Sequence, residues 1–131
     1  MPGLRRALVL GLVALAACGG GGSAPAPAGK PQAVGEGLCV VRRQAAARSV
    51  AAGATFYDRS HAGLHTLASN LEAKGDQAAA GRLLEAMQVV EADIAASPSP
   101  PSLPADVDRL ITATRNGLDA LSIRPPACMR S

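Results

Sequence analysis

The sequence predicts an all-α fold: a small up-down helical bundle closed by one disulfide. Apolar residues recur every three or four positions over most of residues 38–131, which is the spacing of one helix face. Short segments rich in glycine or proline interrupt this pattern and mark helix ends. Cys39 and Cys128 stand near the two ends of that stretch, where a bond between them would close the domain.

Residues 1–17 are typical of an export signal. Arg5 and Arg6 form its charged part, and the apolar run over residues 7–17 is shorter than the roughly 20 residues that span a bilayer. The run leads into Leu15-Ala16-Ala17-Cys18, which resembles the lipobox of bacterial lipoproteins. An ordinary signal peptide, cut at an A-x-A-like site, is the alternative.

The lipobox resemblance implies cleavage before Cys18 and a diacylglycerol on the Cys18 sulfur. Two or more acyl chains anchor a protein stably to a bilayer. The protein is then exported and attached to the outer face of the cell membrane, or to an outer membrane if the host has one. Its net charge falls from +3 to +1, because Arg5 and Arg6 leave with the signal. That balance argues against a nucleic-acid partner.

Residues 18–37 are expected to form the lipidated cysteine and a flexible linker. Seven glycines and three prolines lie in residues 19–37 without apolar periodicity. The folded domain is therefore expected over residues 38–131. With Cys18 used for lipid, Cys39 and Cys128 remain, and cysteines of an exported protein are expected to pair. Two free or intermolecular thiols are the alternative.

Three apolar stripes predict the helices in chain order. The first ends before Gly75 and Asp76, which suit a helix end and the N-cap of the next helix. The second ends before the proline-rich residues 97–102, and the third ends before Pro125. The stripes comprise Val50, Ala54, Tyr57, His61, Leu64, Ala68 and Leu71; Ala80, Leu83, Met87, Val90 and Ile94; and Val107, Ile111, Thr114, Leu118 and Leu121.

The disulfide bears on whether the bundle has three helices or four. A single first helix over residues 39–74 would be about 50 Å long at 1.5 Å per residue. In a three-helix bundle it would place Cys39 and Cys128 at opposite poles, whereas disulfide Cα atoms lie within about 7 Å. The disulfide therefore favours a break in the first helix.

Gly53 is the expected position of that break. It can end one helix, and Thr55 with Asp58 resembles a capping box that begins the next. The four helices would then span residues 39–51, 55–73, 77–96 and 104–123, with both cysteines at one end. The first stripe runs through Gly53 without interruption, which favours three helices. Four helices are the favoured prediction, and three are the alternative.

Asp58, His61 and His65 form the constellation most capable of chemistry. They stand at i, i+3 and i+7, so a helix would place them on one face. Two histidines four residues apart can ligate one Zn²⁺, Cu²⁺ or Ni²⁺, with a carboxylate as the third ligand. Tyr57 is close enough to contact a bound ligand.

One helix supplies at most three metal ligands here. A fourth would come from water, from Glu91 or Asp93, or from a second copy of the chain. Two other interpretations stay open: a buried polar network in which the histidines only hydrogen-bond, and a contact to a partner or small ligand. A zinc-protease motif is excluded, because Ala62 stands where HExxH requires glutamate.

No catalytic motif is present in the sequence. A P-loop, a dinucleotide-binding glycine motif, a nucleophile elbow and a haem-attachment motif are all missing. The sequence therefore predicts a protein that is not an enzyme. The favoured hypothesis is a membrane-anchored binding or interaction module with an envelope protein partner. The alternative is a lipoprotein that handles a transition metal or haem through Asp58, His61 and His65.

Overall fold

The computed structural model describes residues 30–131. The export signal, the lipobox with Cys18 and residues 19–29 of the expected linker lie outside the described residues. The elements are α1 (Pro31–Ala46), α2 (Ala51–Phe56), the π-helical turn η1 (Tyr57–His61), α3 (Ala62–Ala73), α4 (Gln77–Ala95), α5 (Leu103–Ala120) and the 3₁₀ turn η2 (Ala127–Met129).

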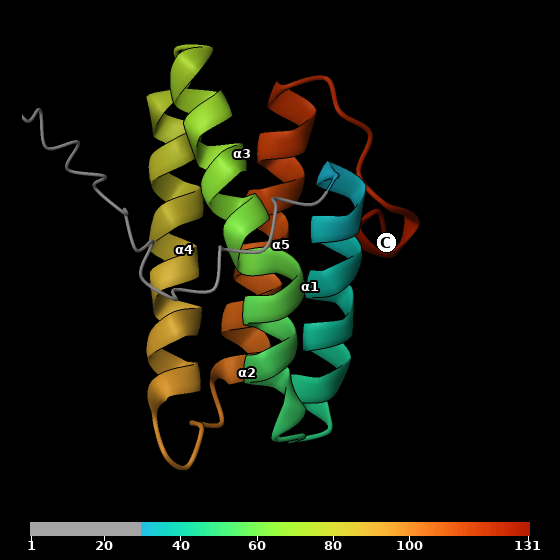
Figure 1. Ribbon diagram of the computed structural model, residues 1–131, viewed down its shortest axis with the longest axis vertical. Coiled ribbons are helices and arrows are strands. Elements are labelled where there is room, and N and C mark those ends of the chain that lie inside the picture. Colours follow the sequence, from blue (N-terminus) through green and yellow to red (C-terminus); the bar gives the residue numbers. More distant parts are fainter. Residues whose placement is uncertain (1–29) are drawn as a thin grey trace, which may run out of the picture.

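Four helical rods make up the bundle, as the favoured prediction had it. α2, η1 and α3 follow one another without a gap and form one long helix, green in Figure 1, between α1 and α4. α1 contacts α2 and α5, and α4 contacts α3 and α5, so the rods close a ring. Residues 30–131 contain no strand, which confirms the all-α fold. Within the same residues, no helix is long and apolar enough to cross a membrane.

The predicted disulfide is present. Cys39 in α1 and Cys128 in η2 are bonded, and their Cα atoms lie 6.3 Å apart. After α5 the chain turns back toward α1, as the red segment of Figure 1 shows. The Arg42 guanidinium donates to the Cys128 carbonyl at 3.2 Å, and the Arg115 guanidinium donates to the Met129 carbonyl at 3.4 Å. The C-terminal segment is thus held by one covalent bond and two hydrogen bonds.

The break in the first helix is real, but it does not lie at Gly53. The chain turns at residues 47–50, where Arg48 has a φ of 54°. Gly53 lies inside α2, where a Cβ would stand only 2.8 Å from Ile94 Cγ2 of α4. The close packing of α2 against α4 therefore explains why position 53 is a glycine. The helix continues through Thr55 and Asp58, so the predicted capping box is wrong.

The folded domain begins earlier than predicted. α1 starts at Pro31, a residue type that suits the first helical turn, so the linker prediction is wrong over residues 31–37. Val34 is almost fully buried there. Gly37, whose residue type suggested flexibility, lies against η1, and a Cβ on it would stand 2.5 Å from Ser60 Oγ. The first two turns of α1 are part of the core.

The first apolar stripe is also misplaced over its N-terminal half. Val50 is fully exposed and Tyr57 is 46% exposed. The buried side chains instead recur at intervals of four, and each interval exceeds one α-helical turn by about 40°. The wider turn of η1 absorbs part of this drift and keeps the series against the core. The series is Ala52, Phe56, Ser60, Leu64 and Ala68.

A candidate metal centre

Three side chains of types that can ligate a metal meet on the face formed by η1, α3 and α4. His61 is the last residue of η1, His65 lies one turn later in α3, and Glu91 lies in α4. Their ligand atoms all lie within 4.8 Å of one another. His61 Nε2 and Glu91 Oε1 are 2.6 Å apart, which is a short hydrogen bond between the long helix and α4.

These separations are close to those that a metal ion requires. Donor atoms about 2.1 Å from a tetrahedral ion lie roughly 3.4 Å from one another. The hydrogen-bonded pair must open by less than 1 Å in this estimate, and the more distant donors must close by somewhat more. Rotations of exposed and half-exposed side chains can provide both movements without moving the helices.

Aromatic rings restrict the orientation of His61. Its ring centroid lies 5.1 Å from that of Tyr57, 5.7 Å from that of Phe56 and 4.8 Å from that of His65. Phe56 is wholly buried and therefore forms a fixed support. Ring packing and the bond to Glu91 together hold the His61 imidazole at the surface, which lowers the conformational entropy lost on ligand binding.

The structure brings three of the four predicted site residues together and leaves the fourth apart. His61 and His65 come together as one turn of helix requires, and the Tyr57 ring packs on His61. Asp58 is exposed and is not among the converging ligands. Asp58 and His61 both lie within the π-helical turn, which has more residues per turn than an α-helix, and this changes the angle that a three-residue spacing spans.

Glu91 joins the two histidines. The sequence left several sources open for a further ligand: water, a second copy of the chain, and the two acidic residues Glu91 and Asp93 of α4. Only the register of α4 against the long helix decides between them, and the sequence carries no signal for that register. Asp93 instead accepts a hydrogen bond from Ser102 at 3.3 Å and lies beside Asp106. Burial raises the pKa of the Asp93 carboxyl above its ordinary 3.8, and neighbouring Asp106 adds to the rise.

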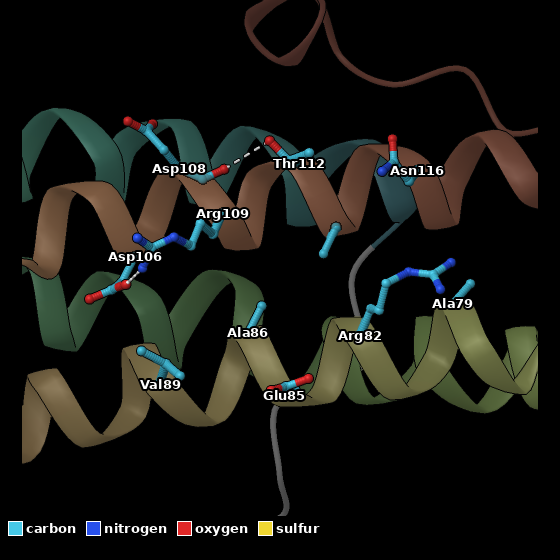
Figure 2. A pocket seen from close by; sticks show the side chains of 11 residues that line it. Ala79, Arg82, Glu85, Ala86, Val89, Asp106, Asp108, Arg109, Thr112 and Asn116 are labelled. Atoms are coloured by element: carbon cyan, nitrogen blue, oxygen red, sulfur yellow. Dashed lines mark hydrogen bonds and ion pairs between the residues drawn. The ribbon is translucent and has the colours of Figure 1, made fainter.

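A second concave feature is the groove between α4 and α5, with a volume of about 610 Å³. Figure 2 shows Arg82 on one helix and Arg109 on the other, with alanine side chains such as Ala86 between them. Arg109 is already paired with Asp106. The lining mixes both signs of charge with small apolar residues, and the histidines are not part of it.

Comparison of the chain with protein-family models, curated proteins and solved structures finds no match. The chemistry of the centre therefore rests on its donors, which are two imidazoles and one carboxylate. Imidazole nitrogen suits borderline divalent ions such as Zn²⁺, Cu²⁺ and Ni²⁺, and a carboxylate completes such sites in many proteins.

Proposed function

We propose that this chain is a lipid-anchored, non-catalytic binding module of the bacterial envelope, and that its ligand is one divalent transition-metal ion. The ion would be held by His61, His65 and Glu91. The observation that carries the proposal is the convergence of these three side chains from two helices, with all ligand atoms within 4.8 Å.

The competing interaction is weak enough for a metal to displace. The bond between His61 and Glu91 joins side chains that are 29% and 28% exposed. A hydrogen bond involving a charged group contributes about 1.5–3 kcal/mol, and partial exposure lowers that figure. Apparent binding free energies of four-ligand zinc sites reach about 10 kcal/mol or more. A three-ligand site retains enough of this to favour the metal.

Within residues 30–131, the two hydroxyl groups directly beside the histidines in sequence are engaged in hydrogen bonds to backbone carbonyls, which supports a binding role. Thr66 follows His65, and its Oγ1 donates to the Ala62 carbonyl at 3.2 Å. Ser60 is the hydroxyl nearest to His61 in sequence, and it is buried. Its Oγ donates to the Val34 carbonyl at 3.0 Å, which occupies it in packing the long helix against α1. The anchoring part of the proposal rests on the lipobox-like Leu15-Ala16-Ala17-Cys18.

We propose a metal ion as the ligand in preference to haem. A haem ring needs an apolar cavity beside its axial histidine, because most of its surface must be covered. The three cavities described in residues 30–131 are lined by other residues than His61 and His65. A metal ion needs only the donors that already converge.

Metal titration of the purified full chain in detergent tests this function. We expect native mass spectrometry to show one Zn²⁺, Cu²⁺ or Ni²⁺ per chain. His61→Ala, His65→Ala and Glu91→Gln should each weaken binding at least about tenfold, because even outer-shell changes at metal sites cost 10–100-fold. Glu91→Gln is the most informative change, because glutamine keeps the size and can still hydrogen-bond to His61.

Asp58→Asn is the matched control. It removes an exposed carboxylate three positions before His61 and leaves the three converging donors unchanged. Its affinity should equal that of the unchanged chain. Metal binding that survives all three site substitutions would place the ion elsewhere and end the proposal.

A further inference from the structure

The described chain offers too few donors to close a metal site. Zn²⁺ in a structural site has four protein ligands, whereas sites that act on or exchange ligands have three and keep a position free. Within residues 30–131, the cluster that could hold an ion comprises His61, His65 and Glu91 alone.

The neighbouring acidic side chains do not take part in the cluster. Asp58 is exposed and lies outside the cluster, and Asp93 is engaged with Ser102. The Tyr57 ring packs against the His61 ring at a centroid distance of 5.1 Å and is 46% exposed. The Tyr57 hydroxyl is therefore the group to test as a fourth ligand.

The centre also opens toward water. His65 is exposed, and the side chains of His61 and Glu91 are each more than a quarter exposed. The buried side of the site is occupied by Phe56, which supplies no donor atom. An ion held by the three ligands would thus have protein on one side and solvent on the other.

We propose that the ion keeps one coordination position open to solvent, and that an imidazole nitrogen from outside the chain binds there in place of water. This inference rests on the proposed metal-binding function and assigns the site to metal exchange with a histidine-bearing donor or acceptor. Imidazole is the matching class, because it is the ligand type that these borderline ions share with the site. The step exchanges one neutral ligand for another and needs no oxidant or reductant.

Electron paramagnetic resonance of the Cu²⁺-loaded full chain tests the open position. The spectrum should show coupling to two nitrogens, from His61 and His65. Addition of imidazole, or of a blocked tripeptide with a central histidine, should change it to three coupled nitrogens. Tyr57→Phe should give the same two-to-three change, because the phenol is not a ligand in this arrangement.

The outcomes separate the two proposals. Cu²⁺ that binds at the three residues but gains no third nitrogen from either reagent overturns the exchange site alone. A gain of the third nitrogen only in Tyr57→Phe shows that the phenol closes the site, and two chains per ion in native mass spectra show that a second copy closes it. Both results overturn the inference. A chain that binds no Cu²⁺, Zn²⁺ or Ni²⁺ overturns the proposed function and the inference with it.

Discussion

Single glycines decide how closely the helices of this bundle approach one another. Gly63 in α3 faces Val34 of α1, and a Cβ built on it would lie 2.1 Å from Val34 Cγ2 and 3.4 Å from Val34 Cγ1. The Val34 Cβ also lies only 3.3 Å from this point, so the buried Val34 side chain or the two helices must shift to admit a Cβ. Gly81 in α4 is exposed, and nothing lies within 4 Å of its Cβ position.

These two glycines form a matched pair for a stability experiment. Gly63→Ala should destabilise the domain by about 1–3 kcal/mol, the usual cost of overpacking. Gly81→Ala should stabilise it by about 0.5–1 kcal/mol, because alanine is the better residue in an exposed helix interior. Urea denaturation followed by circular dichroism measures both changes. Equal effects of the two substitutions would contradict the close approach of α1 and α3.

The residues of the candidate metal centre could be predicted only in part. His61 and His65 are four positions apart, and that spacing suffices to place them one helical turn apart. Asp58 fits the same rule, but Asp58 and His61 lie within a π-helical turn, and no local signal predicts such a turn. Glu91 comes from another helix, so its contribution depends on tertiary packing and appears only in the structure.

At the scale of elements, the long helix shows why periodicity alone misplaced a stripe. The predicted stripe alternated spacings of four and three, which keeps residues on one face of an α-helix. The buried series uses spacings of four throughout, from Ala52 to Ala68, and fits because η1 adds a wider turn. C-terminal to that turn, the predicted Leu64, Ala68 and Leu71 are buried as expected.

The start of α1 is a second error of prediction, because the composition of residues 31–37 indicated a linker where the structure has a helix. Its first two turns contain Gly35 and Gly37, residues that are common in linkers, and it follows a chain rich in glycine and proline. Both glycines are buried, since they face the C-terminal segment and η1 where a side chain would not fit. Low helix propensity was overridden by packing.

A truncation tests whether these turns belong to the core. A chain beginning at Leu38 loses buried Val34 and leaves the buried Ser60 hydroxyl without its carbonyl acceptor. We expect it to be less stable by about 3–5 kcal/mol than a chain beginning at Lys30, from the sum of lost burial and an unsatisfied hydroxyl. Guanidinium denaturation of both chains measures the difference. Equal midpoints would restore residues 31–37 to the linker.

At the scale of the whole molecule, the disulfide and the core are expected to hold the fold without help from the candidate metal centre. Cys39 and Cys128 are 89 positions apart, and closing so long a loop contributes about 4–5 kcal/mol in the chain-entropy model. The candidate ligands belong to η1, α3 and α4, whereas the disulfide joins α1 to η2. The domain is therefore expected to fold before it binds metal, unlike small zinc domains that need the ion to fold.

The thermal unfolding of the oxidised protein should show this separation of fold and ligand. Metal-free protein should have the full helical circular dichroism spectrum, and a free metal concentration a hundred times the dissociation constant should add about 2.7 kcal/mol of stability. For a domain of this size that corresponds to a rise in Tm of roughly 10 °C or more. Glu91→Gln should keep the same helical spectrum and lose most of the rise. A metal-free chain that is unfolded with its disulfide intact would instead make the ion part of the fold, and would require the core and the disulfide to stabilise the bundle far less than their burial and loop length indicate.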